Sequence, residues 1–495
     1  MDYEVSKSLG KLHITKNSSS TACLVKNEIK STAVVVPMVP THTMAYFPEK
    51  DPSPEDMVYG ELILLGYNGS QESMKTSTHG RKHKSKMTLC IKEDSNGIKR
   101  GTTHLFDGPP EECPLVSDST KYVISYSQDR SKTILVEYVE DPNKDMFQIG
   151  RSSENQIDFT IVDTWLAAGT NNGVCSSAAN SARSLVKNQL CVSGDANRPI
   201  SSTISRYACR IITDRLNPGK CYVYAAGFDS RKNIFLGEKA TKWSKNEGEC
   251  DGLTTNGVLI LHPNNSSEED SSGLFTWREI SVDGEIHKLR QSRSSNIKGE
   301  LIESESNQLQ DGTIIDLCGA TLLWRSADGL ANSPSVQKLE EVLDQLNAGK
   351  PQCPVNLNTL VIPKKKAKSQ TSRQPYVYIE CGHVQGKHDW GMSRSSGATV
   401  KFKCPICLIE SEKVVQLVMG MESAFHLDSS SLDYCFNPCG HMASMNTVRY
   451  WAKIPMPHGT TSFHPICPFC SCLLATKKPF LRLIFQDHCY EGNLN

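Results

Sequence analysis

Between residues 59 and 324 the sequence repeats short apolar or alternating runs that are rich in β-branched and aromatic residues. Clusters of Gly, Asn, Asp and Ser separate many of these runs. Short strands bounded by such turns are typical of antiparallel sheets, so the pattern predicts a mainly β fold built on a β-sandwich. The runs are Glu61–Tyr67, Tyr122–Tyr126, Thr133–Val139, Ile157–Val162, Ala208–Ile212, Cys221–Ala225, Val258–His262, Phe275–Ile280 and Thr321–Trp324.

The pattern divides the chain into segments. Residues 1–55 mix Ser, Thr, Lys and Pro with little periodicity, which predicts a disordered N-terminal tail. The sandwich would then span residues 56–330. Within it, residues 165–201 are rich in Ala, Ser, Asn and Gly and predict a long loop inserted at the surface.

A helix and a basic linker are expected over residues 331–375. Ser333 would cap this helix and Pro334 would take its first position. Apolar residues then recur on one helical face, and Gly349 would end the helix. Residues 376–495 remain for a small α+β domain.

The composition favours a soluble protein. The chain has 495 residues, with 54 Lys and Arg against 54 Asp and Glu, so no net charge draws it to nucleic acid or to a membrane. Its apolar runs are far shorter than a membrane span, and the polar segment from Met1 to Lys16 lacks the apolar core of a signal peptide. Ten of the 19 cysteines fall in residues 353–495, and a reducing compartment would keep them as thiols. We therefore expect a cytoplasmic protein with neither a nucleic-acid nor a membrane partner.

Four pairs of metal-ligating residues occur in the C-terminal region, in the order Cys-x-His, Cys-x-x-Cys, Cys-x-His, Cys-x-x-Cys. Each half of this series offers three thiolates and one imidazole, which is the ligand set of a closed structural zinc site. The repeated spacing predicts two zinc ions that hold the region together. The pairs are Cys381 with His383, Cys404 with Cys407, Cys439 with His441, and Cys467 with Cys470.

Two groupings of these pairs are open. In the sequential grouping, each Cys-x-His pair shares an ion with the Cys-x-x-Cys pair that follows it. In the interleaved grouping, like pairs share an ion. Three thiolates leave each sequential site at a charge of about −1, whereas the interleaved sites would carry about 0 and about −2. Charge therefore favours the sequential grouping.

The segment Cys404–Leu408 resembles the opening of many RING fingers, in which the apolar residue before the second Cys touches a ubiquitin-conjugating enzyme. Ile406 occupies that position. Pro468 stands where the final RING pair has a proline that often contacts the same enzyme, and Trp451 would add an aromatic anchor. Ordinary core packing is the alternative for Ile406 and Trp451. Neither half of the series keeps an open coordination position, so we expect no catalytic residue and a metal-scaffolded docking surface.

Three short phrases in the predicted sandwich, taken together, resemble the phosphothreonine-binding loops of the forkhead-associated domain. Arg151 could grip a phosphate group bidentately. Ser205 and Arg206 could add a hydroxyl and a second cation, and Thr255 and Asn256 could hold the phosphate and the peptide backbone. The usual pattern has a His that braces the loop three residues after the Ser. This chain has Ala208 there, which puts the rigidity of the loop in question.

Six longer phrases occur along the chain, namely Met146–Arg151, Ser202–Arg206, Ala225–Ser230, Asn233–Lys239, Asp251–Gly257 and Asp316–Trp324. In this order they resemble phrases of the Pellino family, and the resemblance covers most of residues 58–490. The resemblance implies a forkhead-associated sandwich with a β appendage, followed by a zinc-bound RING-like domain. It also implies a RING-type ubiquitin ligase that binds a charged conjugating enzyme and the phosphorylated receptor-associated kinases of innate immune (Toll-like receptor) signalling.

Two features depart from the family, namely the length of the 165–201 insertion and the extended N-terminal tail.

Two other functions are also compatible with the residues. One is a phospho-dependent signalling adaptor that uses the zinc domain only to bind proteins. The other is a zinc-dependent nucleic-acid binder, which the balanced charge disfavours.

Overall fold

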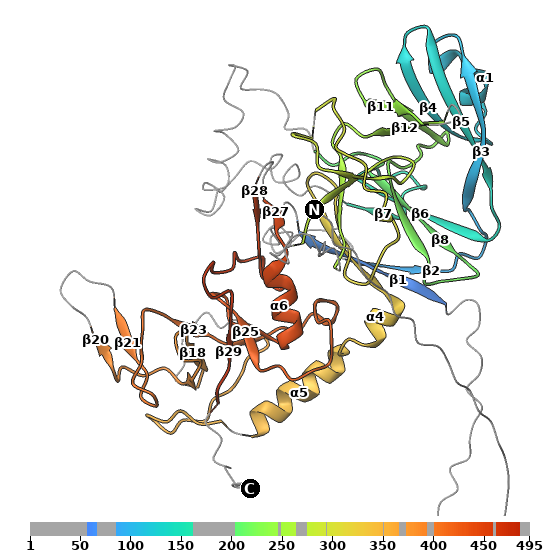
Figure 1. Ribbon diagram of the computed structural model, residues 1–495. Coiled ribbons are helices and arrows are strands. Elements are labelled where there is room, and N and C mark those ends of the chain that lie inside the picture. The colour runs from blue at the N-terminus through green and yellow to red at the C-terminus, as the bar shows by residue number, and fades with distance from the viewer. Residues whose placement is uncertain are drawn as a thin grey trace, which may run out of the picture. The chain divides into compact units, whose positions relative to one another are not determined.

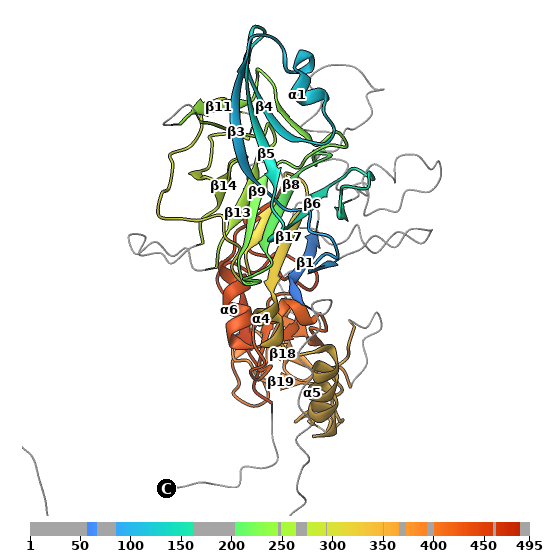
Figure 2. The same cartoon turned by 90° about the vertical axis from the view of Figure 1, so that its right-hand side faces the viewer.

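The computed structural model describes residues 57–66, 86–161, 203–245, 249–263, 275–293, 295–349, 351–365, 373–393, 400–458 and 462–485. The predicted tail, residues 1–55, and the predicted insertion, residues 165–201, lie outside these ranges. Figure 1 shows the elements, and Figure 2 shows them after a quarter turn.

The larger sheet of the sandwich has seven antiparallel strands in the order β15-β14-β13-β16-β17-β1-β2. Its register places Leu62 opposite Trp324, so the first described strand pairs with the last strand of the sandwich. The strands are β1 (Val58–Gly66), β2 (Lys86–Cys90), β13 (Val258–Leu261), β14 (Arg278–Ile280), β15 (Ile286–Lys288), β16 (Ile314–Asp316) and β17 (Thr321–Ser326).

A four-stranded sheet in the order β7-β6-β8-β9 contributes to the same core. A second four-stranded sheet, β10-β4-β5-β3, forms the expected β appendage, with the short helix α1 (Pro114–Ser117) packed against it. The mainly β prediction is therefore confirmed. The remaining strands of this half are β3 (Ile98–Phe106), β4 (Tyr122–Asp129), β5 (Lys132–Glu140), β6 (Lys144–Gly150), β7 (Phe159–Thr160), β8 (Cys209–Asp214), β9 (Cys221–Ala225), β10 (Asn233–Leu236), β11 (Thr241–Ser244) and β12 (Cys250–Leu253).

Both faces of the seven-stranded sheet are apolar. In β1, Leu62 and Leu64 belong to the sandwich core, whereas Ile63 and Leu65 belong to a second core on the opposite face. β13 alternates in the same way, with Leu259 in the second core. Successive side chains of a strand point to opposite faces, so a sheet that is covered on both faces requires continuous apolar runs such as the one in β1.

The C-terminal module covers that second face. Its residues Phe425, Val448 and Trp451 lie in the same buried cluster as Ile63 and Leu259 of the sheet. The helices around it are α4 (Ala327–Ala331), α5 (Val336–Ala348) and α6 (Met445–Lys453), and the strands are β18 (Tyr376–Tyr378), β19 (Val384–Gln385), β20 (Met392–Ser393), β21 (Lys401–Lys403), β22 (Glu410–Ser411), β23 (Val414–Gln416), β24 (Val418–Met419), β25 (Tyr434–Phe436), β26 (His441–Ala443), β27 (Met456–His458), β28 (Ser462–His464) and β29 (Phe480–Arg482).

Helix α5 is capped two residues later than predicted. The side chain of Ser335, and not that of Ser333, accepts the backbone N–H of Lys338. The Ser333 hydroxyl instead accepts a bond from Arg325 and donates to the His426 carbonyl. Gly349 ends the helix as predicted.

The helix and the segment after it belong to the core of the C-terminal module. Leu339 and Leu343 of α5 are buried together with Cys353 and Ile362 of the following segment and with Val377 of β18. Residues 366–372 of the predicted basic linker lie outside the described ranges.

Candidate functional site

The structure gathers the eight predicted metal ligands into two clusters. One contains Cys381, His383, Cys404 and Cys407, and the other contains Cys439, His441, Cys467 and Cys470, with the ligand atoms of each cluster within 4.8 Å of one another. This is the sequential grouping that charge favours, and the interleaved grouping is not the one that the described residues form.

The spacing of the donor atoms fits a tetrahedral ion. The distance from Sγ to Nδ1 is 3.7 Å both for Cys404 with His383 and for Cys467 with His441. Metal–sulfur and metal–nitrogen bonds of about 2.3 and 2.05 Å at a tetrahedral angle place the two donors about 3.6 Å apart. The donors therefore already stand where a metal of zinc's size requires them.

Burial and hydrogen bonds shift the pKa values of two thiols of the second cluster in opposite directions. Burial, together with hydrogen bonds to Cys439 and Cys470, raises the pKa of the Cys467 thiol well above its ordinary value. Hydrogen bonds from Cys439 and Cys467 hold the pKa of the Cys470 thiol well below its ordinary value. A bound dication would stabilise such a thiolate. It would also favour deprotonation of the neighbouring thiols, because a metal binds its cysteine ligands as thiolates.

Both clusters are built by the same backbone plan. In each Cys-Gly-His turn the glycine N–H donates to a carbonyl four residues earlier, from Gly382 to Tyr378 at 2.8 Å and from Gly440 to Phe436 at 2.7 Å. Each Cys-x-x-Cys pair is followed directly by a residue in the left-handed conformation, Leu408 at φ 64° or Ser471 at φ 56°. We call this second turn a knuckle: residues 404–409 form the first knuckle and residues 467–472 form the second.

The glycine of the Cys-Gly-His turn is irreplaceable on steric grounds. Gly440 has φ +79°, and a Cβ added there would lie 1.9 Å from the Gln416 carbonyl oxygen. The left-handed backbone alone costs a non-glycine residue roughly 1–3 kcal/mol.

We expect Gly440→Ala to lower the zinc content of the purified protein from two ions per chain toward one, measured by elemental analysis. Gly237→Ala, where nothing lies within 4 Å of the added Cβ, is the matched control and should leave the content unchanged.

The first cluster has a buried support that the sequence did not reveal. The Gln385 side chain is fully buried, and its Nε2 donates to Cys404 Sγ at 3.3 Å. A hydrogen bond of this kind orients a ligating thiolate. The equivalent position of the second copy is Ala443, so the motif spacing carried no signal for Gln385.

The predicted conjugating-enzyme contacts fall in different environments. Ile406 is 40% exposed, as such a contact requires. Trp451 is fully buried, and its indole N–H donates to the Phe425 carbonyl, so the core-packing alternative applies to it. Pro468 is also buried. A buried side chain presents no surface to a partner, so Ile406 is the one residue of the three that a partner could reach.

The second cluster lies in the core that the module shares with the sandwich. Cys439 and Cys467 are members of the same buried cluster as Leu259 of β13. Polar bonds cross the same boundary: the Trp277 indole donates to the Pro455 carbonyl at 2.6 Å, and the Tyr450 hydroxyl donates to the Gly312 carbonyl.

Arg325 of β17 is the buried centre of this boundary. Its side chain is fully buried and pairs with Asp311 at 2.9 Å. It also donates to the carbonyls of Ala424 and His426, which belong to the C-terminal module. A buried guanidinium is stable only when its donors are satisfied, so the position of the module is specified by these bonds.

The predicted phosphate-binding residues converge at loop tips of the sandwich. Arg151 follows β6, Ser205 and Arg206 precede β8, and Thr255 and Asn256 connect β12 to β13. The side chains of Arg151, Arg206 and Thr255 are exposed.

Hydrogen bonds tie these loops to one another. Arg151 Nε donates to the Ile204 carbonyl at 2.8 Å, and Asn256 Nδ2 donates to the Thr203 carbonyl at 2.7 Å. Ala208, at the position of the usual bracing His, is buried and bonded through its backbone to Ile149. The loop therefore has braces that do not require the missing His.

Two arginines that the sequence analysis missed support the same loops. Arg293 donates to the carbonyls of Asn256 and Gly257 and pairs with Asp316. Arg290 donates to the Thr254 carbonyl at 2.9 Å and forms a buried pair with Glu279. Neither arginine belongs to a recognisable motif, and only the fold brings them to the loops.

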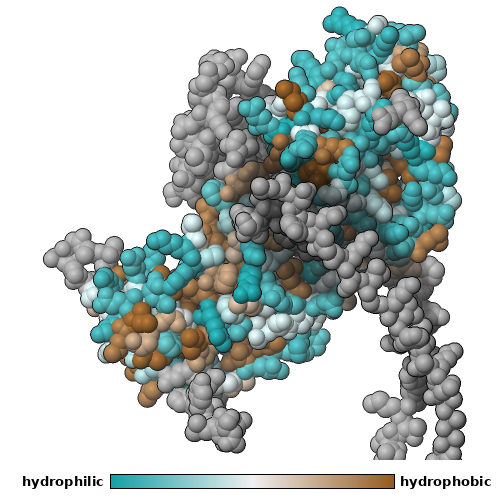
Figure 3. Space-filling model, in the orientation of Figure 1, coloured by the Kyte–Doolittle hydropathy of each residue, from teal (hydrophilic) through white to brown (hydrophobic). Residues whose placement is uncertain are grey.

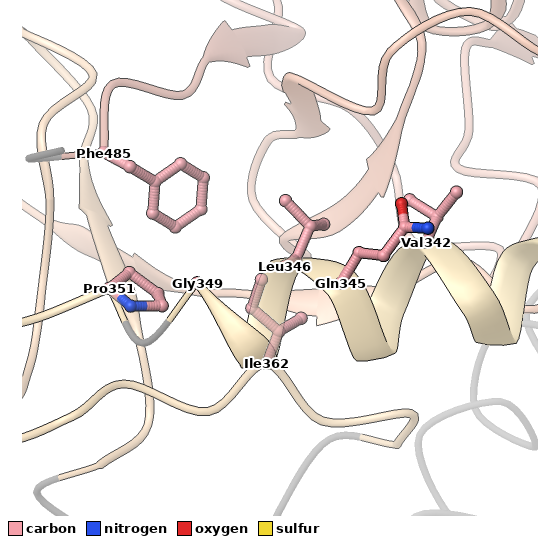
Figure 4. A pocket seen from close by; sticks show the side chains of 7 residues that line it. All are labelled: Val342, Gln345, Leu346, Gly349, Pro351, Ile362 and Phe485. Atoms are coloured by element: carbon pink, nitrogen blue, oxygen red, sulfur yellow. The ribbon is translucent and has the colours of Figure 1, made fainter. Parts of the chain in front are cut away.

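A cavity of about 340 Å³ beside α5 offers no acid–base chemistry (Figure 4). None of its lining side chains is titratable. The lining residues are Val342, Gln345, Leu346, Gly349, Pro351, Ile362 and Phe485.

In the described ranges, no helix has both the length and the apolar character that crossing a membrane requires.

Comparison with known proteins places both halves of the chain in one family. Residues 50–342 match the Pellino FHA domain, and residues 346–490 match the Pellino RING domain. The chain is 48% identical over 432 residues to Protein pellino of Drosophila melanogaster, an alignment that covers 87% of this chain and 93% of the relative.

Two mammalian relatives carry the name of an enzyme. The human E3 ubiquitin-protein ligase pellino homolog 2 is 44% identical over 437 residues, covering 88% of this chain and 96% of the relative. The mouse E3 ubiquitin-protein ligase pellino homolog 3 is 44% identical over 435 residues, covering 87% and 90%. With both domains present in the same order and most of its length aligned to these proteins, the chain belongs to the Pellino family of ubiquitin-protein ligases.

Proposed function

We propose that this ligase binds phosphothreonine-containing signalling proteins at the loop tips of its sandwich and promotes transfer of ubiquitin from a conjugating enzyme to their lysines. The observation that carries the proposal is the convergence of Arg151, Arg206 and Asn256, which are separated in sequence, at loops that bond directly to one another. Exposed guanidinium groups on a braced backbone suit recognition of a dianionic phosphate.

The metal in each cluster is proposed to be zinc. Three thiolates and one imidazole per cluster are the ligands of structural zinc sites. When bound, zinc would hold the four ligands in a tetrahedron and stabilise the fold around them. Elemental analysis of the reduced protein should find two zinc ions per chain, and protein that is well folded without any bound metal would contradict this assignment.

The ligase would act without a covalent intermediate on its own side chains. The C-terminal module holds the charged conjugating enzyme, and the sandwich holds the target, so the thioester and the target lysine meet at high effective concentration. Ile406, exposed on the first knuckle, is the predicted contact that the structure leaves available to the conjugating enzyme.

We further propose the cellular setting that the family resemblance implies. The protein would act in the cytoplasm, in Toll-like receptor signalling of innate immunity, on phosphorylated receptor-associated kinases. Capture of such kinases from stimulated cells, with loss of capture after phosphatase treatment, would support this setting. Equal capture before and after treatment would contradict it.

Arg151→Ala is expected to weaken binding of a phosphothreonine peptide by about 10- to 100-fold, because charge-assisted hydrogen bonds contribute about 1.5–3 kcal/mol. Isothermal calorimetry would measure the affinity. The melting temperature should change little, because the Arg151 side chain is exposed. Arg130→Ala is the matched control: Arg130 is 96% exposed in the turn between β4 and β5 and should leave the affinity unchanged. Equal binding of the phosphorylated and unphosphorylated peptides would show that the loops are not a phosphate reader.

The alternative function is a phospho-dependent adaptor that uses the zinc module only for binding. A reconstituted reaction with activating enzyme, conjugating enzyme, ubiquitin and this protein separates the two functions. The ligase proposal expects modified lysines in the products, identified by mass spectrometry. Phosphopeptide binding without any ubiquitin transfer would favour the adaptor.

A further inference from the structure

A hydrogen-bonded pair of side chains lies beside the predicted phosphate-binding residues and is not among them. The Tyr207 hydroxyl donates to both carboxylate oxygens of Glu154 at 2.8 Å. Gln156 Nε2 donates to the same carboxylate at 2.7 Å. Glu154 lies three residues after Arg151. Tyr207 directly follows Arg206. We call Glu154 and Tyr207 the clasp, because they join the two loops that carry the predicted phosphate-binding arginines.

The clasp also acts on the Arg206 side chain. The guanidinium carbon of Arg206 is 5.5 Å from the centre of the Tyr207 ring, a distance at which a cation is attracted to an aromatic face. Hydrogen bonds from Tyr207 and Gln156, and to a smaller extent the positive charge of Arg206, lower the pKa of the Glu154 carboxyl group. Glu154 is therefore ionised at neutral pH, and its negative charge attracts the Arg206 guanidinium.

Support of this kind matters for Arg206 because of its surroundings. Arg206 is an exposed side chain on a sandwich whose surface is largely polar in Figure 3. An exposed arginine samples many rotamers in water, and ordering it around a ligand costs free energy. A ring held against the side chain and a carboxylate close by restrict these rotamers before a phosphate arrives. Such preorganisation raises the affinity of a site without adding a contact.

The charge of Glu154 makes it unsuited to contact the phosphate itself. A carboxylate and a phosphate group repel each other. The oxygens of Glu154 instead accept the hydrogen bonds from Tyr207 and Gln156. An anion beside a phosphate-binding loop favours binding only when it serves a neighbouring cation, and Arg206 is a cation that Glu154 attracts.

We propose that Glu154 and Tyr207 are positioning residues, which hold the Arg206 guanidinium in place for the phosphate group of the target. The inference rests on the proposed binding of phosphothreonine and deepens it. Neither residue touches the phosphate, and each acts through Arg206. The chain has Ala208 where the usual pattern has a His that braces this loop. The clasp supplies a side-chain brace of different chemistry.

Other bonds hold the backbone of the two loops. The Arg151 N–H donates to the Ser205 carbonyl, and the Ser152 N–H donates to the Arg206 carbonyl, each at 3.1 Å. These bonds do not involve the side chains of the clasp, which are both partly exposed. Removing the Tyr207 hydroxyl should therefore leave the melting temperature almost unchanged, so that a change in affinity reports on the position of the guanidinium.

Tyr207→Phe in the full chain is expected to weaken binding of a phosphothreonine peptide by about 3- to 10-fold, which corresponds to the cost of ordering one long side chain. The probe is a peptide that the wild type selects from a phosphothreonine library, and isothermal calorimetry would measure its affinity. The variant keeps the ring and removes only the hydroxyl that holds it. Tyr138→Phe is the matched control: its hydroxyl donates to Asp283 at 3.3 Å, on strand β5 of the appendage, and the affinity should not change.

Two variants of Glu154 separate the hydrogen bond from the charge. Glutamine and alanine both remove the negative charge, but only glutamine keeps an oxygen that accepts the Tyr207 hydroxyl. Glu154→Gln should therefore bind the peptide about 3- to 10-fold more tightly than Glu154→Ala. Equal affinities of the two variants would contradict the clasp.

A double-mutant cycle with Arg206→Ala shows whether the clasp acts through Arg206. In the Arg206→Ala background, Tyr207→Phe should no longer change the affinity, because no guanidinium remains to be positioned. An equal loss in both backgrounds would mean that the clasp supports the loop as a whole, and this result would overturn the inference.

The outcomes separate this inference from the function on which it rests. If the wild-type chain binds phosphorylated and unphosphorylated peptides equally well, the phosphate-reader function fails and the inference fails with it. If the wild type binds only the phosphorylated peptide and Tyr207→Phe binds it equally tightly, the reader function stands and the clasp has no positioning role.

Discussion

Replacing Cys467 with alanine is expected to remove the second metal ion and to reduce ubiquitin discharge at least about 100-fold. Cys467 is fully buried, is one of four ligands, and lies in the core shared by the sandwich and the C-terminal module. Apparent binding energies of structural zinc are about 10–16 kcal/mol at neutral pH, and this binding energy is also folding energy. Its loss should therefore disorganise both the module and its contact with the sandwich. Zinc content should fall from two ions per chain to one.

Cys435→Ala is the control for this experiment. Cys435 is equally buried and lies four residues before Cys439, but it belongs to neither metal cluster. Removing a buried thiol that is not a ligand costs only a small cavity, of order 1 kcal/mol. This variant should keep two zinc ions and most of its activity. Normal discharge by a Cys467→Ala protein with a single zinc ion would refute the scaffold role of the second cluster.

Arg325→Met should destabilise the protein by about 1–3 kcal/mol, because that is the usual cost of leaving a buried hydrogen-bond acceptor without its donor. The variant would leave Asp311 without this cation and the Ala424 carbonyl without its Arg325 donor, whereas the His426 carbonyl would keep its bond from Ser333. Urea unfolding would measure the free energy. The lower stability should appear as separation of the module from the sandwich at a lower urea concentration than in the wild type. Limited proteolysis between residues 326 and 376 would detect this separation.

Arg130→Met is the comparison, because Arg130 is 96% exposed and its ion-pair distance to Glu238 is 3.9 Å. Such surface pairs contribute about 0–1 kcal/mol. An Arg325→Met protein that unfolds at the wild-type urea concentration, with the same proteolytic pattern, would mean that the bonds across this boundary contribute little to stability.

The parts of the site that could be predicted from sequence are those encoded by local spacing. A Cys-x-x-Cys turn directs two sulfurs to one ion, so the ligands and their sequential grouping follow from order and charge. The position of Arg151 and Asn256 at loop tips was predictable for a similar reason, because the phrases that contain them lie at the ends of recognisable strands. Alternating apolar runs likewise indicated the sandwich.

The parts that could not be predicted depend on contacts between distant segments. The burial of Trp451 follows from the packing of the module on the seven-stranded sheet, which no local pattern specifies. The sequence did contain one indication, because the unbroken apolar run Leu62–Leu65 is longer than a half-exposed strand needs. Arg290 and Arg293 reach the loop at Thr254–Gly257 only through the fold. The cap of α5 moved from Ser333 to Ser335 because Arg325 engages the Ser333 hydroxyl.

The buried boundary at Arg325 has a consequence for which lysines receive ubiquitin. In a ligase whose target-binding and enzyme-binding domains are joined by a flexible linker, the conjugating enzyme can reach lysines over a wide area of the target. Here the two halves share one apolar core and a buried cation. If the sandwich binds the phosphothreonine as proposed, the distance from that residue to the thioester of the conjugating enzyme is fixed by the fold. Lysines at one narrow range of spatial separation from the phosphorylated residue should be marked, regardless of how many others the target exposes.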